Sequence, residues 1–256
     1  MRVAGFTDYD LPIWNQESET APFLRGYDAI VLREDTMVIH DSQVFGDWKK
    51  IKQYVVGAAE FEKDGHRLTI MNVNRHKIEE TLGVDLLMYH HTYNSYVLVQ
   101  YKKMTKDGES LVYRPIDNSY LSEINRMEEF QKQIKTIIDV SSPKHFRLNG
   151  EFFYFKLCAA TLEDPLSTKM IPGMYFPLQY WKMLLSSNDI LGERGGKKIS
   201  YSNVSRYLNN TLFVELVQNG WIGSQLSNTD IITEQIQHSI SGGKSIILAK
   251  YSQLAT

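Results

Sequence analysis

Two kinds of hydrophobic pattern occupy the first sixty residues. Short runs rich in β-branched residues at 29–32 and 37–39 lie on either side of a polar pair and predict a β-hairpin in the amino-terminal arm. From Asp47 to about Phe61 the apolar residues recur every three or four positions. That spacing predicts an amphipathic helix with one buried stripe.

A strand and a short helix are expected next. The β-rich run Leu68–Val73 predicts the strand. Asn74 can cap a helix over 75–82 with its side-chain oxygen, and Gly83 follows the helix at the usual position of a left-handed C-cap. The helix therefore ends directly before the next strand.

The middle of the chain predicts the centre of a sheet. Two β-rich runs, 84–89 and 96–102, are separated by a polar stretch and predict neighbouring strands. The second run opens with consecutive apolar residues, so both faces of this strand should be covered by helices. A long amphipathic helix over 121–137, ended by Ser-Ser-Pro at 141–143, and a strand over 151–157 follow.

Helical patterns with glycine and proline between them dominate the last hundred residues. We expect a helix over 202–217 and a helix–strand pair over 230–251. Tyr175, Tyr180 and Trp181 have the spacing of core positions on a helix. These patterns predict a mainly helical region that packs on the sheet.

The predicted fold class is α/β, with a mixed central sheet flanked by helices. The expected parts are an arm at 1–46 that contains the hairpin, a core at 47–158 and a carboxy-terminal accessory region at 159–256.

Composition narrows the function classes. The 256 residues are 43% hydrophobic, enough to fill a core, and the net charge of −2 argues against a protein coated in positive charge. Any contact with nucleic acid must then be local. The single cysteine, Cys158, cannot form an internal disulfide, and no long uncharged apolar stretch occurs. We expect a cytoplasmic protein without a membrane span or secretion signal.

One constellation carries candidate chemistry. Asp85 opens one predicted strand, and Gln100-Tyr101-Lys102 closes the next. Side chains two apart on a strand share a face, so Gln100 and Lys102 should converge beside the Asp85 carboxylate. Oxygen ligands bind a hard divalent cation, and a nearby lysine can hold the attacking water or the developing charge of phosphodiester hydrolysis.

This order of residues resembles the PD-(D/E)xK nuclease superfamily, also called restriction-endonuclease-like. The pattern there is Asp, a gap, then Glu or Asp, any residue and Lys. The resemblance covers about 47–158. Gly83-Val84 stands before Asp85 where the family name has proline, and Gln100 replaces the acidic residue. The Gln-x-Lys form is similar to methylation-dependent restriction and related defence nucleases.

The resemblance implies a restriction-endonuclease-like core and a site that uses Mg²⁺ or Mn²⁺. Asp85, Gln100, the backbone carbonyl of Tyr101 and an acidic residue on the preceding helix would bind the metal. Glu79 is preferred for the last role over its neighbour Glu80. Lys102 would orient the attacking water. Because Gln100 removes a negative charge, either the metal affinity would fall or Glu79 would have to compensate.

The function implied is a DNA endonuclease acting as an antiviral or host-defence effector, with RNA as the less favoured substrate. Binding of a regulatory protein partner, or formation of a homo-oligomer, would activate the nuclease. Phosphate contacts are expected from cations around the site and from a basic glycine loop: Lys103, Lys106, Arg114, Arg194, Lys197 and Lys198.

Two alternatives stay open. The first is a catalytically inactive binding or regulatory module with the nuclease fold, in which Gln100 marks the loss of cleavage. The second is an unrelated metabolic α/β protein, in which Asp85, Gln100 and Lys102 would not converge.

Weaker motifs favour ordinary structure. Ser241-Gly242-Gly243-Lys244-Ser245 lacks the earlier glycine of a nucleotide-binding loop and precedes a predicted strand. His90-His91 and His40-Asp41 have no partners at zinc spacing and are interpreted as polar turn residues.

Overall fold

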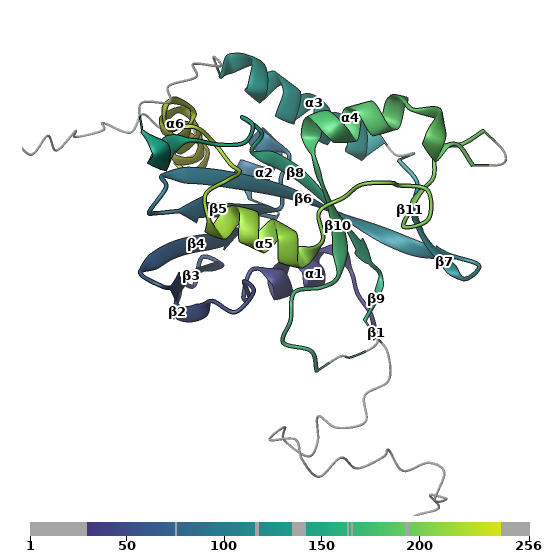
Figure 1. Ribbon diagram of the computed structural model, residues 1–256, viewed down its shortest axis with the longest axis horizontal. Coiled ribbons are helices and arrows are strands. Elements are labelled where there is room, and N and C mark those ends of the chain that lie inside the picture. Colours follow the sequence, from purple (N-terminus) through teal and green to yellow (C-terminus); the bar gives the residue numbers. More distant parts are fainter. Residues whose placement is uncertain are drawn as a thin grey trace, which may run out of the picture.

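A β-sheet lies between two layers of helices in the computed structural model of this protein (Figure 1). The structure describes residues 30–74, 76–115, 118–134, 142–162, 164, 166–192 and 195–241. Its helices are α1 (Glu34–Asp41), α2 (Lys77–Leu82), α3 (Asn118–Gln133), α4 (Leu178–Ser186), α5 (Asn210–Gln218) and α6 (Leu226–Ile240). The predicted α/β class is confirmed.

Nine strands form the main sheet, in the order β10-β8-β6-β5-β4-β3-β2, with β7 and β11 joined to the far part of β6. The strands β2 to β6 form an antiparallel meander, whereas β6 and β8 are parallel and joined through α3. The sheet is therefore mixed, as predicted. Its strands are β2 (Lys49–Gln53), β3 (Ala58–Lys63), β4 (His66–Asn72), β5 (Leu86–His90), β6 (Ser95–Asp107), β7 (Ser110–Tyr113), β8 (Phe153–Ala159), β10 (Gly173–Pro177) and β11 (Ile199–Ser200).

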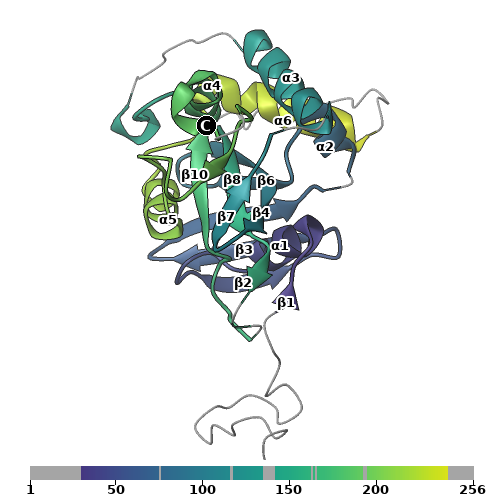
Figure 2. The ribbon, with the colours of Figure 1, turned by 90° about the vertical axis from the view of Figure 1, so that its right-hand side faces the viewer.

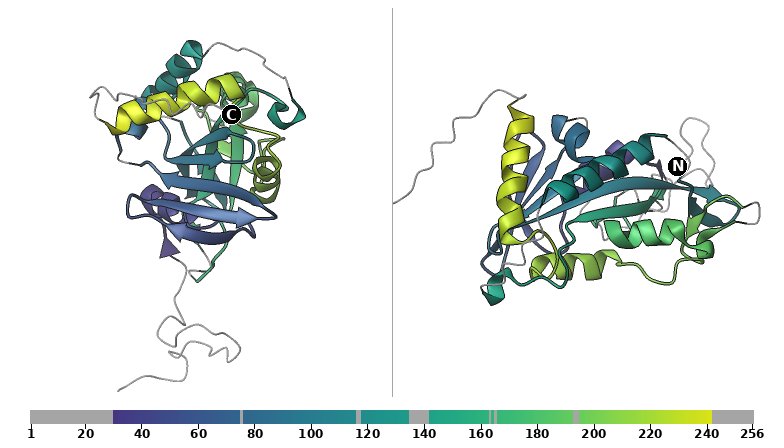
Figure 3. Two further views of the ribbon diagram at one scale, coloured as in Figure 1. Left: turned by 90° about the vertical axis from the view of Figure 1, so that its left-hand side faces the viewer. Right: turned by 90° about the horizontal axis from the view of Figure 1, so that it is seen from above.

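Strand β6 lies at the centre, and both of its faces are covered. Leu98 and Met104 pack in the core beneath α2, α3, α4 and α6, while Val99 and Tyr101 pack in the core shared with α1 and α5. Figures 2 and 3 show these helices on the two sides of the sheet. The prediction of a doubly covered central strand is confirmed.

Two elements near the amino terminus differ from the sequence prediction. The segment 47–61 forms β2 and β3 instead of a helix, because Ala59 and Phe61 alternate with Glu60 on a strand, and Gly57 turns the chain with φ +82°. The predicted hairpin is also wrong: residues 37–39 lie in α1, and β1 (Ile30–Val31) pairs with β9 (Thr161–Leu162).

Helix α2 ends at the predicted glycine but begins later than predicted. Gly83 adopts the left-handed conformation, with φ +69°, and caps the helix. The N-cap is His76 instead of Asn74, whose side-chain amide donates to Asp35 Oδ1 at 2.9 Å. Asn74 thus fixes α1 relative to the end of β4.

The carboxy-terminal region carries α4, α5 and α6 and extends the sheet through β10, which places Tyr175 on a strand instead of a helix. Tyr175 and Trp181 are buried, as their spacing predicts. Helix α5 begins at Asn210, eight residues after the predicted start at 202, because Asn209 caps it by accepting from Leu212 N–H at 2.9 Å.

Two sequence predictions lie outside the described residues: the strand after α6 and most of the glycine-rich loop at 241–245. Among the helices that are described, none is long and apolar enough to cross a membrane.

Candidate functional site

Antiparallel register brings Asp85 next to Gln100. Leu86 of β5 pairs with Val99 of β6, so the residue before Leu86 lies opposite the residue after Val99. Residues directly opposite each other in an antiparallel pair project to the same face. Asp85, Gln100 and, two positions further along β6, Lys102 therefore share the face covered by α2 and α3.

Hydrogen bonds join these side chains. Asp85 Oδ2 accepts from Gln100 Nε2 at 2.7 Å and from the backbone N–H of Tyr101 at 2.8 Å. Gln100 Nε2 also donates to the backbone carbonyl of Tyr101 at 3.3 Å. Strand β5 begins at Leu86, which pairs with Val99, so β5 does not extend alongside Tyr101. The backbone N–H of Tyr101 therefore binds the Asp85 side chain instead of a backbone carbonyl of β5.

Lys102 is held by a residue that the sequence analysis missed. Its Nζ lies 2.6 Å from Glu123 Oε2 on α3, and both side chains are almost fully buried. Glu123 follows Tyr120 by three positions and precedes Met127 by four, so it is a charged residue on the buried stripe of α3. A charged residue at an apolar position of a predicted helix is the sequence feature that could have indicated a buried partner for Lys102.

Close packing of Gly83 brings α3 to the site. A Cβ atom at Gly83 would lie 2.8 Å from the backbone oxygen of Glu123, so only glycine allows this approach without a shift. The same glycine that ends α2 therefore sets the distance between Glu123 and the start of β5.

Two further carboxylates lie near these residues, one beside Lys103 and one whose charge acts on Asp85. Glu34, at the first position of α1, accepts from the backbone N–H of Lys103 at 2.7 Å through its Oε1. It was missed because its segment was predicted to be a hairpin turn. Glu79 is half-buried and its charge acts on Asp85, whereas Glu80 is exposed. This difference favours Glu79 over Glu80.

Burial raises the pKa of Asp85 to about 8, and the negative charges of Glu79 and Glu123 contribute to the rise. The Tyr101 N–H and the Lys102 ammonium oppose it. Burial also raises the pKa of Glu123 despite its contact with Lys102. Without a bound cation, the Asp85 carboxyl therefore retains its proton at neutral pH, and a cation bound beside it would favour the ionised form.

Oxygen ligands for a cation come from three kinds of group. Gln100 Oε1 is buried, and none of the described residues donates a hydrogen bond to it. Turning the amide over would place this oxygen where Nε2 now contacts Asp85 Oδ2 and the Tyr101 carbonyl. One carboxylate, one amide and one carbonyl then fit a hard divalent cation. The described residues contain no group of three His, Cys, Asp or Glu side chains arranged to hold a metal.

The predicted phosphate-binding residues do not form one free basic surface. Asp107 Oδ2 accepts from Arg114 at 2.6 Å and lies 3.0 Å from Lys198 Nζ, which neutralises part of their charge. Lys106 and Lys197 are exposed, whereas Lys103 is half-buried beside Glu34. Arg194 lies outside the described residues.

Behind Tyr101, on the opposite face, lies a buried ion pair. Asp41 Oδ2 accepts from Lys156 Nζ at 2.5 Å and from the Tyr101 hydroxyl at 3.0 Å. Both partners of the pair are fully buried. Asp41 is thus a core residue of α1, which corrects its interpretation as a turn residue; His90 is likewise buried, within β5.

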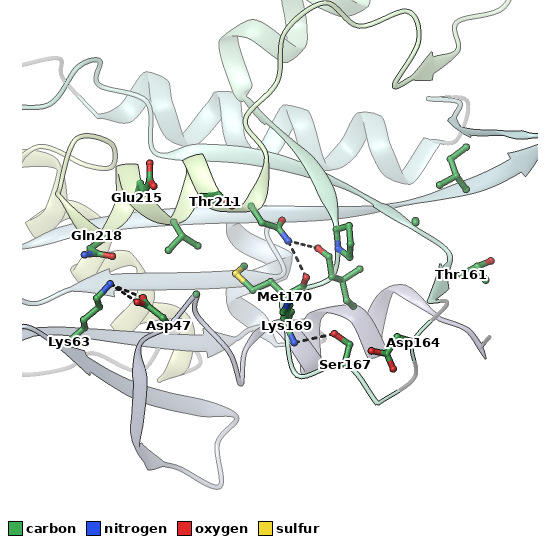
Figure 4. A pocket seen from close by; sticks show the side chains of 17 residues that line it. Asp47, Lys63, Thr161, Asp164, Ser167, Lys169, Met170, Thr211, Glu215 and Gln218 are labelled. Atoms are coloured by element: carbon green, nitrogen blue, oxygen red, sulfur yellow. Dashed lines mark hydrogen bonds and ion pairs between the residues drawn. The ribbon is translucent and has the colours of Figure 1, made fainter. Parts of the chain in front are cut away.

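A groove of about 890 Å³ opens beside this ion pair, between α5 and the segment 166–172 (Figure 4). Ile171 lines it and donates its backbone N–H to Asp41 Oδ1 at 2.9 Å. Asp85, Gln100 and Lys102 line neither this groove nor a smaller cavity between α3 and α4. Tyr101 nevertheless connects the two faces, because its hydroxyl binds Asp41 and its N–H binds Asp85.

Comparison with known proteins gives no relative: no family model matches the chain, and no similar curated protein or solved structure was found.

Proposed function

We propose that this protein is a metal-dependent nuclease that hydrolyses phosphodiester bonds. The observation that carries the proposal is the direct contact between Asp85 and Gln100, with Lys102 on the same strand face. The PD-(D/E)xK pattern places an Asp, an acidic residue and a Lys together, and here Gln100 stands in the position of the second acidic residue.

The proposal extends to a restriction-endonuclease-like core. Support comes from the order of elements: a meander of β4, β5 and β6, then α3, then β8 parallel to β6. The segment 47–61 forms strands instead of a helix, and the helices α1, α2 and α3 carry the acidic residues Glu34, Glu79 and Glu123.

Asp85, Gln100 Oε1 and the Tyr101 carbonyl would hold Mg²⁺ or Mn²⁺, with Glu79 adding negative charge. When bound, the cation would polarise the phosphate and lower the pKa of a ligated water. Lys102 would orient the attacking water. Its ammonium is paired with Glu123, so in this proposal the substrate phosphate replaces Glu123 as the partner of Lys102.

DNA is the proposed substrate, with RNA as the alternative, and the proposed role is that of a cytoplasmic antiviral or host-defence effector licensed by a partner protein or by oligomerisation. These steps rest on the resemblance of the Gln-x-Lys motif.

A non-catalytic module with the same fold is the second candidate. It is favoured by the burial of Asp85, Gln100 and Lys102, which are 5%, 3% and 5% exposed. A buried site with its lysine already paired would hold the sheet and α3 together without contacting substrate.

Cleavage assays separate the two. Full-length protein is incubated with plasmid, linear and single-stranded substrates in Mg²⁺, Mn²⁺ or chelator, beside Asp85→Asn and Lys102→Met. Glu79→Gln and Glu80→Gln form a matched pair, since the charge of half-buried Glu79 acts on Asp85 whereas Glu80 is exposed. We expect metal-dependent cleavage that Asp85→Asn abolishes and Glu80→Gln leaves unchanged. Asp85→Asn protein that cuts at the wild-type rate ends the proposal, as does wild-type protein that leaves every substrate intact.

A further inference from the structure

A second cavity, of about 460 Å³, lies on the α3 side of the sheet. Its walls come from the end of α3, the segment 149–152 before β8, α4 and the start of α6. Most of the side chains are polar: Glu128, Gln131, Lys132, Asn149, Glu151, Gln179, Lys182, Gln225 and Asn228, with Ile134 and Phe152 as the apolar part.

Three oxygen atoms of this lining are buried without a hydrogen-bond donor from any described residue: Glu151 Oε2, Gln225 Oε1 and Asn228 Oδ1. Gln225 and Asn228 are only 7% and 5% exposed. Leaving a buried acceptor unsatisfied destabilises the folded protein, so three such atoms in one cavity are unusual. A ligand that donates hydrogen bonds would offset this cost.

We propose that this cavity binds an organic cation that carries several N–H donors, an alkylammonium or guanidinium group. All three unpartnered atoms are acceptors, so the ligand that satisfies them is one that donates hydrogen bonds. Glu151 supplies a negative charge, and Phe152 offers an apolar surface to the hydrocarbon part of such a ligand.

Neighbouring charges are compatible with a cationic ligand. The Lys182 ammonium is paired with Glu128, so this pair adds no net charge. Lys132 is exposed at the rim. Burial raises the pKa of Glu151, while hydrogen bonds from Gln179 and Gln131 and the charge of Lys182 lower it. A bound cation would favour the ionised form of this carboxylate further.

A bare divalent metal fits less well. Glu151 Oε2 is the one carboxylate oxygen among the three unpartnered atoms, and hard cations of this class prefer several carboxylate oxygens at short distance. The cavity also has room for a ligand of several heavy atoms.

Binding is measured by calorimetry with full-length protein and agmatine, which carries both a guanidinium and an ammonium group. Tetramethylammonium is the matched control, since it has the charge but no N–H donor. A capped Gly-Arg-Gly peptide distinguishes an arginine side chain of a partner from a free small molecule. We expect agmatine or the peptide to bind, and tetramethylammonium and MgCl₂ not to compete.

Two substitutions test the assignment in opposite directions. Glu151→Gln should weaken binding about tenfold, and Asn228→Asp, which the first turn of a helix accommodates, should tighten it. Asp230→Asn removes an exposed charge from the same helix, outside the cavity, and should change nothing. Equal affinity for tetramethylammonium, or an Asn228→Asp protein that binds no tighter, would overturn the proposal. Asp85→Asn should bind agmatine like wild type, so this result is independent of nuclease activity.

Discussion

Gln100 presents its amide nitrogen, not its oxygen, to Asp85: Nε2 lies 2.7 Å from Asp85 Oδ2. The amide nitrogen of Gln100 thus donates hydrogen bonds both to Asp85 and to the Tyr101 carbonyl. A cation at the same point would require the amide to turn over, so that Gln100 Oε1 faces it. The residue that departs from the family pattern therefore stabilises the site in the absence of metal.

Gln100→Glu should convert this neutral contact into a pair of carboxylates. Without metal we expect lower stability than wild type at pH 8, because two like charges in contact disfavour ionisation. Mg²⁺ should restore stability, and cleavage should be retained or raised. Thermal unfolding with and without Mg²⁺ measures the effect, and Gln53→Glu, exposed on β2, controls for the added charge. The idea fails if Mg²⁺ stabilises Gln100→Glu and wild type equally.

Asp85 should make the protein less stable as pH rises. Its pKa is near 3.8 in an unfolded chain and about 8 in the folded protein. Between these values the folded state retains a proton that the unfolded state has lost, so the free energy of unfolding falls by up to about 1.4 kcal/mol per pH unit. Asp85→Asn removes this contribution.

Urea unfolding of wild type and Asp85→Asn at pH 5 and pH 8 measures the difference. All other titrating groups are common to both proteins. From pH 5 to pH 8 the free energy of unfolding of wild type should therefore fall relative to that of Asp85→Asn. Parallel pH profiles would show that Asp85 has an ordinary pKa in the folded state.

Local pattern was sufficient to place the centre of the sheet and the strand pair that carries Asp85 and Gln100. Continuous hydrophobicity located β6, because a strand buried on both faces has few alternatives. Spacing along β6 was enough to put Gln100 and Lys102 on one face.

Partners from distant segments could not be predicted in the same way. Glu123 reaches Lys102, and Glu34 reaches Lys103, only through the packing of α3 and α1 on the sheet. The segment 47–61 was misassigned because its apolar spacing suits a helix, yet Val55 is fully exposed at the turn and Ile51 lies on an exposed edge strand. Pairing of β3 with β4 in the sheet makes this segment a strand despite its helical spacing.

Gly83→Ala should destabilise the protein through two effects, a strained left-handed backbone and contact with Glu123. Gly65→Ala is the matched control, since Gly65 has φ +76° but no atom within 4 Å of an added Cβ. Backbone strain alone should cost about 1–2 kcal/mol at either position. Chemical unfolding should show a larger loss for Gly83→Ala. Equal losses would mean that α3 moves freely away from residue 83.

The ion pair behind Tyr101 should behave as a buried pair. Lys156→Met leaves the Asp41 charge without its cation and should cost about 3–5 kcal/mol, and adding Asp41→Asn should recover much of the loss. The exposed pair Lys63–Asp47 is the control: Lys63→Met should change the free energy of unfolding little. If Lys156→Met is as harmless as Lys63→Met, Asp41 is not ionised in the core.

A double-mutant cycle on Lys102 and Glu123 separates structural from catalytic roles. Each single change, Lys102→Met or Glu123→Gln, leaves a buried partner uncompensated and should cost about 3–5 kcal/mol, while the double variant should lose less than the sum. The cleavage activities of these variants should not follow their stabilities. Glu123→Gln frees the ammonium and should retain activity at temperatures where the variant is folded, whereas both proteins that lack Lys102 should be inactive. If Glu123→Gln is folded but as inactive as Lys102→Met, Glu123 has a direct part in cleavage and is not merely the resting partner of Lys102.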